Sequence, residues 1–490
     1  MSEWSRRGFV HHMGILAGSA ALYQAAGPLA ASTSGDEVLG FKSAVELSGL
    51  IRARDLSSVE LTEYFIRRIE RFDSKLNAIP VRDFERALAS AKDADRALGK
   101  GSVAGPLHGL PMTIKESYDI EGLATTWGVP DLENNVATSD SAVVARFKQA
   151  GAHFMGKTNV PLMLGDFQSY NDIYGTTNNP WNPDLTPGGS SGGTAAALAA
   201  GMTGLDSGSD IGGSIRNPAH FCGVYGHKPT WGIVPPQGQA PPGVVSVPDL
   251  AVVGPLARSA EDLAQAMDIV AGPDALNANG WRLQLPEPRM QSFKNLRVAI
   301  WPDDAVAPVD REVARRAREI GERLARLGAN VSETARPAFA SGASHDTYLK
   351  LLLSIVGGPD GNIDHQSWMG QNNTRTRYRM AWQTFFKDWD VLICPIMPTT
   401  AFAHDHSPQA QRILLVNGEP TPYRNQIFWA GIATLSYLPS TVFPTGLSMD
   451  GLPIGLQAVG AEFDDRTTIE FARLMAQEIG GFVAPPGYGD

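Results

Sequence analysis

Residues 208–230 read GSDIGGSIRNPAHFCGVYGHKPT, and they follow PGGSSGG at 187–193. Each stretch places a serine directly behind two glycines, Ser214 in the first and Ser190 in the second. Glycines let the backbone turn sharply and approach other groups closely. A serine hydroxyl held on such a turn is a candidate nucleophile, but it is weak at neutral pH and needs a base. The sequence therefore has to supply a base for Ser214.

The histidines do not supply that base in a recognisable pattern. His220 and His227 lie shortly after Ser214, and nothing in their surroundings marks either as its partner. The GxSxG elbow of α/β-hydrolases is missing, because Ile215 and Arg216 follow the serine. A Ser-His-Asp triad is therefore disfavoured. PGGSSGG also fits a phosphate-binding turn at a helix N-terminus, but it lacks the GK[ST] ending of a P-loop.

The bulk composition excludes several protein classes. The chain has 490 residues, 43% of them hydrophobic and 19% charged, with a formal net charge of −10. An acidic balance of this kind argues against a general nucleic-acid binder, which needs a basic face. Cys222 and Cys394 form no CxxC pair and no HExxH is present, so no metal site is expected. We expect both cysteines to be buried free thiols, with a disulfide between them left open.

The first residues resemble a targeting segment. Arg6 and Arg7 are paired, a weakly apolar run follows at about 13–29, and small residues stand at 30–32. This order is that of a twin-arginine export signal. We therefore expect a signal peptide at 1–31, a mature domain at 32–490, and a periplasmic or extracellular location. An ordinary terminus that stays attached is the alternative, and the occurrence and position of cleavage are left open.

Segments with helical and strand patterns alternate along the chain. Ser57 and Glu60 match a capping box before a helix that ends near residue 72, and a second helix is predicted at 84–98. A long loop is predicted at 171–193. Buried strands are predicted in the runs GPLHGLPMTIKES, AHFMGKTN, VLICPIMP and SYLPSTVFPTG. This alternation predicts a layered α/β fold in a single domain.

Taken together, several stretches resemble the amidase signature family of serine hydrolases. The resemblance covers about residues 40–480, and its motifs are long, ordered and correctly spaced. They are GPLHGLPMTIKES (105–117), GKTNVP (156–161), YGTTNNPWNP (174–183), PGGSSGG (187–193), GSDIGGSIRNPAHFCGVYGHKPT (208–230) and GPLARS (254–259), with VLICPIMPTT (391–400) and GLPIGLQAVG (451–460) as weaker C-terminal matches. The resemblance implies an α/β amidase signature fold. Its large, mostly parallel or mixed twisted central sheet is covered by helices on both faces.

The resemblance also implies a catalytic triad of two serines and a lysine. Ser214 is the implied nucleophile, and Ser190 is the bridging serine after a cis peptide from Gly189. Lys115, at the end of PMTIK, is the implied base. A lysine acts as a base only when neutral, and its apolar neighbours in PMTIK are expected to lower its pKa by desolvation.

The same resemblance implies how the tetrahedral oxyanion is held. The backbone N–H groups of Ile211, Gly212, Gly213 and Ser214 are the predicted donors. Asp210 is expected to hold this turn in place through hydrogen bonds.

Three further residues are assigned roles around the triad. Ser191 is expected to support the triad by hydrogen bonding, and Gly189 to permit the cis peptide. Arg216 is either a contact for a substrate carboxylate or a buried structural arginine, and the second interpretation is favoured.

Substrate choice is assigned to three stretches near the site, at 162–172, 348–357 and 425–439. Pockets for small molecules are mostly apolar, and the last two stretches are rich in Leu, Ile, Phe and Trp. We therefore expect an apolar or aromatic substrate, with ordinary core helix as the alternative for these stretches. The candidate substrate contacts are Leu164, Gly165, Gln168, Tyr170 and Arg216.

The predicted activity is the hydrolysis of a carboxylic amide to an acid plus an amine or ammonia, through an acyl-enzyme on Ser214. A carbamate (urethane) or ester hydrolase on the same triad is the alternative. A glutamine-dependent transamidating protein that acts on misacylated tRNA and a catalytically silent binding protein are the remote alternatives. The expected partner is a small-molecule amide, with no cofactor, no metal, no nucleic acid and no stable membrane insertion after signal removal. A homodimer is left open.

Overall fold

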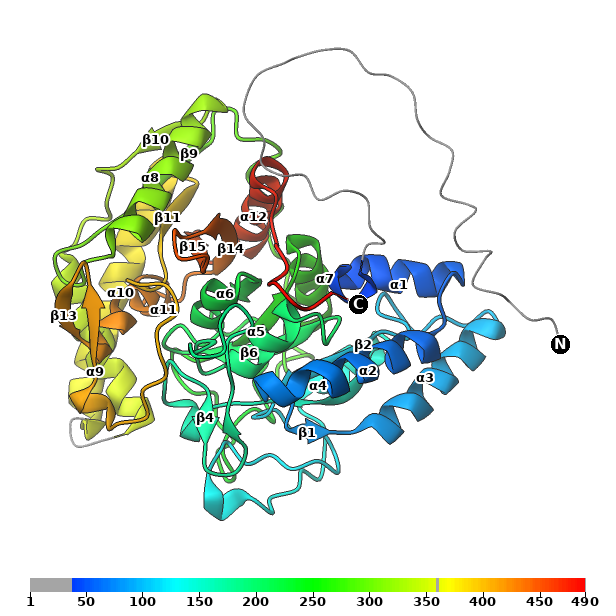
Figure 1. Cartoon of the computed structure of the whole chain (residues 1–490). Helices are drawn as coiled ribbons and strands as arrows, with labels where there is room; N and C mark the ends of the chain where they lie inside the picture. The colour runs from blue at the N-terminus through cyan, green and yellow to red at the C-terminus, as the bar shows by residue number, and fades with distance from the viewer. Residues whose placement is uncertain (1–37, 358–360, 490) are drawn as a thin grey trace, which may run out of the picture. The chain divides into compact units, whose positions relative to one another are not determined.

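The computed structural model describes residues 38–357 and 361–489, which belong to the unit Val38–Asp490 (Figure 1). The predicted signal peptide at 1–31 lies outside these residues. Among the helices of this part of the chain, none is both long and apolar enough to cross a membrane.

The centre of the unit is an eight-stranded mixed sheet with the strand order β10-β9-β11-β15-β14-β7-β8-β6. Parallel pairing is confined to β10–β9 and β9–β11, and the remaining neighbours pair antiparallel. The sheet is mixed, which is one of the two forms that the family resemblance implied, and it is not mostly parallel. Its strands are β6 (Asp206–Asp210), β7 (Tyr225–Lys228), β8 (Val252–Ala257), β9 (Arg297–Ile300), β10 (Asn330–Ser332), β11 (Val391–Pro395), β14 (Ser440–Leu447) and β15 (Pro453–Val459).

A second, three-stranded sheet with the order β1-β3-β2 lies against the β6 edge. The Thr113 N–H in β2 donates to the Leu205 carbonyl, 3.3 Å away, just before β6 begins. This bond sets the end of β2 beside β6, the strand that leads into the Ser214 turn. The strands are β1 (Val81–Arg82), β2 (Pro111–Lys115) and β3 (His153–Thr158), and two small hairpins pair β4 (Tyr170–Asn171) with β5 (Gly175–Thr176) and β12 (Ile413–Val416) with β13 (Glu419–Pro422).

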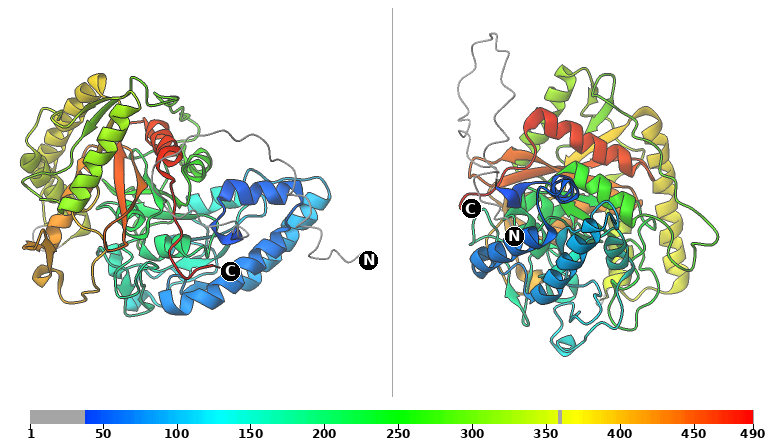
Figure 2. Two further views of the ribbon diagram at one scale, coloured as in Figure 1. Left: turned by 45° about the horizontal axis from the view of Figure 1, so that its top comes forward. Right: turned by 90° about the vertical axis from the view of Figure 1, so that its right-hand side faces the viewer.

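Helices cover both faces of the central sheet (Figures 1 and 2). Consecutive strand residues point to opposite faces, and in β14 Val442 packs in a cluster with Ala219 of α6, whereas the ring of Phe443 meets Phe471 of α12 at 5.6 Å. Helices α6 and α12 therefore lie on opposite faces. The helices are α1 (Ala44–Ala53), α2 (Ser58–Leu76), α3 (Phe84–Gly99), α4 (Ala142–Gln149), α5 (Gly192–Ala199), α6 (Arg216–Cys222), α7 (Ala260–Val270), α8 (Arg311–Arg326), α9 (Ser341–Val356), α10 (His365–Asp388), α11 (Ile427–Thr434) and α12 (Asp465–Ile479).

The elements predicted from local signals are present. Ser57 caps α2, its hydroxyl accepting from the Glu60 N–H while the Glu60 carboxylate accepts from the Ser57 N–H, which is the predicted capping box. Helices α2 and α3 pack side by side (Figure 2). Apart from the two-residue strands β4 and β5, the segment 171–191 has no regular structure, as predicted for a loop, and α5 begins at Gly192.

Candidate active site

Lys115 is the last residue of β2, and its Nζ lies among hydroxyl groups. The side chain is fully buried, with Nζ 2.7 Å from Ser190 Oγ and 2.9 Å from Ser209 Oγ. Burial lowers the pKa of Lys115 to about 7, against the attraction of the Asp210 and Asp206 carboxylates, which raises it. A substantial neutral fraction of this lysine is therefore available near pH 7.

Ser190 lies on the glycine-rich turn that enters α5. The Gly189–Ser190 peptide is cis, as the resemblance implied. A Cβ on Gly189 would lie 2.4 Å from the Asp166 carbonyl oxygen, so the backbone of the 166–168 loop is packed directly on this peptide. Only glycine fits at this close approach.

The two serine turns are joined through their backbones. The Ser191 N–H donates to the Ser214 carbonyl at 3.1 Å. The Ser191 hydroxyl itself is buried and has no hydrogen-bond partner among the described residues. The hydrogen bond that Ser191 contributes to the triad is thus made by its main chain.

Ser214 lies in the turn between β6 and α6, at the outer end of the arrangement. It keeps 8% of its surface exposed, whereas Ser190 keeps 1% and Lys115 none. Exposure thus falls from the predicted nucleophile through the bridging serine to the base. This order leaves Ser214 open to a substrate while the base stays desolvated.

Asp210 holds the Ser214 turn, as predicted. Its carboxylate accepts from the backbone N–H of Gly213 at 2.9 Å and of Ile215 at 3.1 Å. The Gly213 N–H is therefore already engaged, which corrects its predicted place among the oxyanion donors. Within the described part of the chain, the N–H groups of Ile211, Gly212 and Ser214 have no protein acceptor. These three groups remain to hold an oxyanion.

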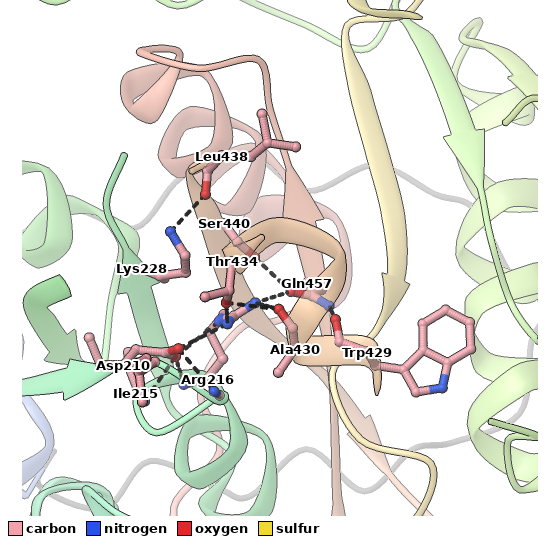
Figure 3. Close-up of polar contacts among 12 residues, drawn as sticks. Asp210, Ile215, Arg216, Lys228, Trp429, Ala430, Thr434, Leu438, Ser440 and Gln457 are labelled. Carbon is pink, nitrogen blue, oxygen red and sulfur yellow. Dashed lines mark hydrogen bonds and ion pairs between the residues drawn. The ribbon is translucent and has the colours of Figure 1, made fainter. Parts of the chain in front are cut away.

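Arg216 is a structural residue. Its side chain is fully buried, and all five guanidinium N–H donors are used: Nε and one terminal nitrogen bind Asp210 at 3.0 and 2.9 Å, and the other bonds go to Ala430, Thr434 and Gln457 (Figure 3). Burial raises the pKa of Asp210, but the Arg216 guanidinium more than offsets this, and the pKa falls to about 2. No donor is left for a substrate carboxylate, so the favoured interpretation of Arg216 as a buried structural arginine is correct and the alternative of a substrate contact is wrong.

Comparison with known proteins identifies the family. The amidase family profile matches residues 60–357 and 358–469. The chain belongs to the amidase family. It is 32% identical over 471 residues to an indoleacetamide hydrolase of Bradyrhizobium diazoefficiens, covering 89% of this chain and 86% of that protein. It is 31% identical over 470 residues to an acylamidase of Rhodococcus erythropolis, covering 89% and 95%. A glutamyl-tRNA(Gln) amidotransferase component of Moorella thermoacetica is also 31% identical, over 487 residues that cover 90% and 97%.

The fold agrees with that of a solved member of the family. The structure of a bacterial aryl acylamidase of the amidase signature family superposes with a TM-score of 0.78 at 24% identity, covering 89% of this chain and 96% of that one. The family membership and the relatives together make this chain an amidase that acts on non-peptide carboxylic amide C–N bonds.

Two residues predicted to contact the substrate of the amidase form hydrogen bonds within the protein instead. Gln168 is fully buried, and its side-chain amide bonds to both the N–H (2.9 Å) and the carbonyl (2.7 Å) of Asp405. The Tyr170 hydroxyl accepts from Arg412 at 2.7 Å, and its ring stacks on His406 at 3.8 Å. Gln168 and Tyr170 thus fasten the 166–170 loop to the 405–412 segment, and their side chains make contacts within the protein and not the predicted contacts to substrate.

The neighbouring positions of this loop stay open to a ligand. Leu164 is half-buried and has a positive φ of 57°, and Gly165 is exposed. Their role as substrate contacts stays a prediction.

The sequence patterns did not identify two polar residues that lie beside Lys115. Ser209 accepts from Lys115 Nζ and also from Gln239 Nε2, 3.1 Å away, and Gln239 donates to Ser117 Oγ as well, at 2.9 Å. Ser209 sits one residue before Asp210 in the same motif, and this proximity was a usable signal. Gln239 comes from a loop with no motif, so only the tertiary structure reveals it.

A buried carboxylate near the lysine was also missed. Asp206, at the start of β6, accepts from the hydroxyls of Thr113 (2.5 Å) and Thr194 (3.1 Å). Burial raises its pKa to about 7. It therefore titrates in the same range as Lys115.

The two histidines near Ser214 are occupied by structural contacts. The His220 ring nitrogens lie 3.0 Å from the Thr399 carbonyl and 2.7 Å from the Gly455 N–H. His227 lies between Thr441 and Asp465. These contacts agree with the prediction that neither histidine is the base.

Proposed function

We propose that the amidase cleaves its substrate through an acyl-enzyme on Ser214, with Ser190 and Lys115 as a proton relay. The observation that carries this proposal is the 2.7 Å contact of the buried Lys115 Nζ with Ser190 Oγ, in surroundings that lower the pKa of the lysine to about 7. A neutral amine has a lone pair and can accept the proton of Ser190. Ser190 then takes the proton of Ser214 as Ser214 attacks the amide carbonyl.

The oxyanion formed in this attack is stabilised by backbone N–H groups. Those of Ile211, Gly212 and Ser214 are the donors that the protein leaves without an acceptor among the described residues. Collapse of the tetrahedral intermediate breaks the C–N bond, and Ser190 returns a proton to the departing amine or ammonia. Water then cleaves the ester of Ser214 by the same relay in reverse and releases the acid.

We propose that the substrate carries an apolar or aromatic group. The side chain of Ile211, near Ser214 in the sequence, belongs to a cluster of apolar and aromatic residues that come from distant parts of the chain, and its half-buried members retain surface for a ligand. Its members include Ile211, Trp231, Leu250, Tyr348, Leu351, Trp368, Ile427, Leu435 and Tyr437. The relative from Bradyrhizobium diazoefficiens, named for an aromatic primary amide, supports the same class.

The experiment that tests the proposal identifies the released amine. The purified enzyme is given an aromatic primary amide, the matching anilide and the matching aryl carbamate. Ammonia from the first alone indicates a narrow leaving-group site, whereas aryl amine indicates an open one. If the carbamate alone is turned over, the substrate class is a carbamate (urethane) and not an amide.

The nucleophile and base are tested with the same substrates. Ser214→Ala should abolish turnover and Lys115→Ala should nearly abolish it, both in folded protein. Full activity of a folded Ser214→Ala enzyme contradicts the acyl-enzyme proposal.

We propose that the amidase is exported before it acts, on the evidence of the paired Arg6 and Arg7 before an apolar run. Export separates the enzyme from the tRNA that the name of the Moorella thermoacetica relative refers to. Cell fractionation tests this. Replacing both arginines by lysine should move the enzyme from the exported to the cytoplasmic fraction, and an unchanged distribution contradicts the proposal.

A further inference from the structure

Tyr348 connects the Ser214 turn to a helix that contributes no part of the triad. It lies on α9 with 1% of its surface exposed, and its hydroxyl donates to the Ile211 carbonyl at 2.7 Å. The two residues are 137 positions apart in the sequence. Burial raises the pKa of Tyr348, so the hydroxyl keeps its proton and acts as a donor.

The carbonyl that Tyr348 binds shares a peptide plane with one of the free oxyanion donors. The Ile211 C=O and the Gly212 N–H belong to the same peptide, which is trans because the one cis bond of the described residues is Gly189–Ser190. In a trans peptide these two groups point in opposite directions. A hydrogen bond that fixes the Ile211 carbonyl therefore also fixes the direction of the Gly212 N–H.

The hydroxyl is itself held rigidly. A Cβ on Gly431 of α11 would lie 2.6 Å from Cδ1 of the Tyr348 ring, so the ring lies directly against the helix backbone. A Cβ on Gly212 would lie 3.7 Å from the Tyr348 hydroxyl oxygen and 3.2 Å from Cδ1 of Ile427. Helices α9 and α11 therefore enclose this side of the turn.

We propose that Tyr348 is a positioning residue for the oxyanion site: its hydrogen bond to the Ile211 carbonyl aims the Gly212 N–H at the substrate oxyanion. A hydrogen bond to the carbonyl also polarises the peptide and strengthens its N–H as a donor. The proposal rests on the acyl-enzyme mechanism above. Tyr348 lies outside every motif of the family resemblance, and the proposal explains why its hydroxyl is nevertheless buried against the Ser214 turn.

The test is Tyr348→Phe, which removes the hydroxyl and keeps the ring. With an aromatic primary amide as substrate, we expect kcat to fall about tenfold with KM nearly unchanged, because one hydrogen bond that orients a donor is lost. Complete loss of a donor sets the upper limit at about 10²–10³-fold. The inhibition constant of an aryl trifluoromethyl ketone, which adds to the serine as a tetrahedral oxyanion, should rise by about the same factor.

Two variants accompany this test. Gly431→Ala pushes a methyl group against the Tyr348 ring and should lower kcat in the same direction. Tyr225→Phe removes another tyrosine hydroxyl with 1% exposure, on β7, and should leave kcat and ketone binding unchanged. Thermal unfolding checks that each variant is folded.

An unchanged kcat in folded Tyr348→Phe overturns the proposal, and so does a loss that appears in KM alone or equally in Tyr225→Phe. These outcomes leave the proposed function standing. Activity of folded Ser214→Ala would instead overturn the acyl-enzyme mechanism itself, so the two failures are distinguishable.

Discussion

The pH dependence of catalysis follows from the state of Lys115. The base works only when neutral, and burial lowers its pKa to about 7. As the pH falls below this value the lysine takes up a proton and the relay from Ser190 stops. At pH 5, about two units lower, only ~1% of the enzyme holds a neutral lysine, so kcat/KM should be about 100-fold lower than on the plateau above pH 8.

The assay is the initial rate of ammonia release from an aromatic primary amide between pH 5 and pH 9, with circular dichroism at each pH to show that the enzyme stays folded. The titration of His220 and His153 does not contribute to the fall in rate between pH 7 and pH 5, because burial lowers the pKa of each to about 4. A flat kcat/KM between pH 5 and pH 7 in folded enzyme refutes the assignment of Lys115 as the base.

Three further substitutions test the surroundings of the triad. Asp206→Asn removes a carboxylate that raises the pKa of the catalytic lysine, so the acid limb of the same pH profile should move to lower pH; an unmoved limb speaks against this coupling. Arg216→Met leaves a buried carboxylate unpaired and should lower the free energy of unfolding by about 3–5 kcal/mol, measured by urea denaturation, whereas a change below about 1 kcal/mol contradicts the structural role. Gly189→Ala places a methyl group 2.4 Å from the Asp166 carbonyl and should lower kcat/KM on the order of 100-fold by shifting the bridging serine, while Gly370→Ala, with open space around it, should match the wild type.

The parts of the structure that could be predicted from the sequence are those with local signals. The capping box of α2 and the apolar runs of β3 and β11 depend on neighbours within a few residues. The triad itself was found through the family resemblance, which carries residues by motif and not by geometry. Its Lys115–Ser190 contact joins residues 75 positions apart, and no local pattern contains that information.

The polar contacts around the triad were predicted less well, because they depend on tertiary packing. Gln168 and Arg216 have side chains suited to binding a substrate, yet both are fully buried and bonded to the protein. Conversely, Gln239 and Tyr348 reach the site from segments without a motif. A side chain's chemistry states what it can bind, but only the fold decides which partner satisfies it first.

Burial lowers the pKa of Lys115, and the partners of the two nearby carboxylates explain why these carboxylates do not cancel that effect. An ionised Asp210 attracts the proton of Lys115, but Arg216 pairs with that carboxylate at 2.9 Å and offsets its charge. Asp206 has no such guanidinium partner among its hydrogen bonds to the described residues, and burial raises its own pKa to about 7, so part of its charge is removed by a proton. One carboxylate is thus compensated by an ion pair and the other by protonation. Arg216 therefore has two roles. It fixes the Asp210 that shapes the nucleophile turn, and its positive charge opposes the attraction of Asp210 for the proton of Lys115.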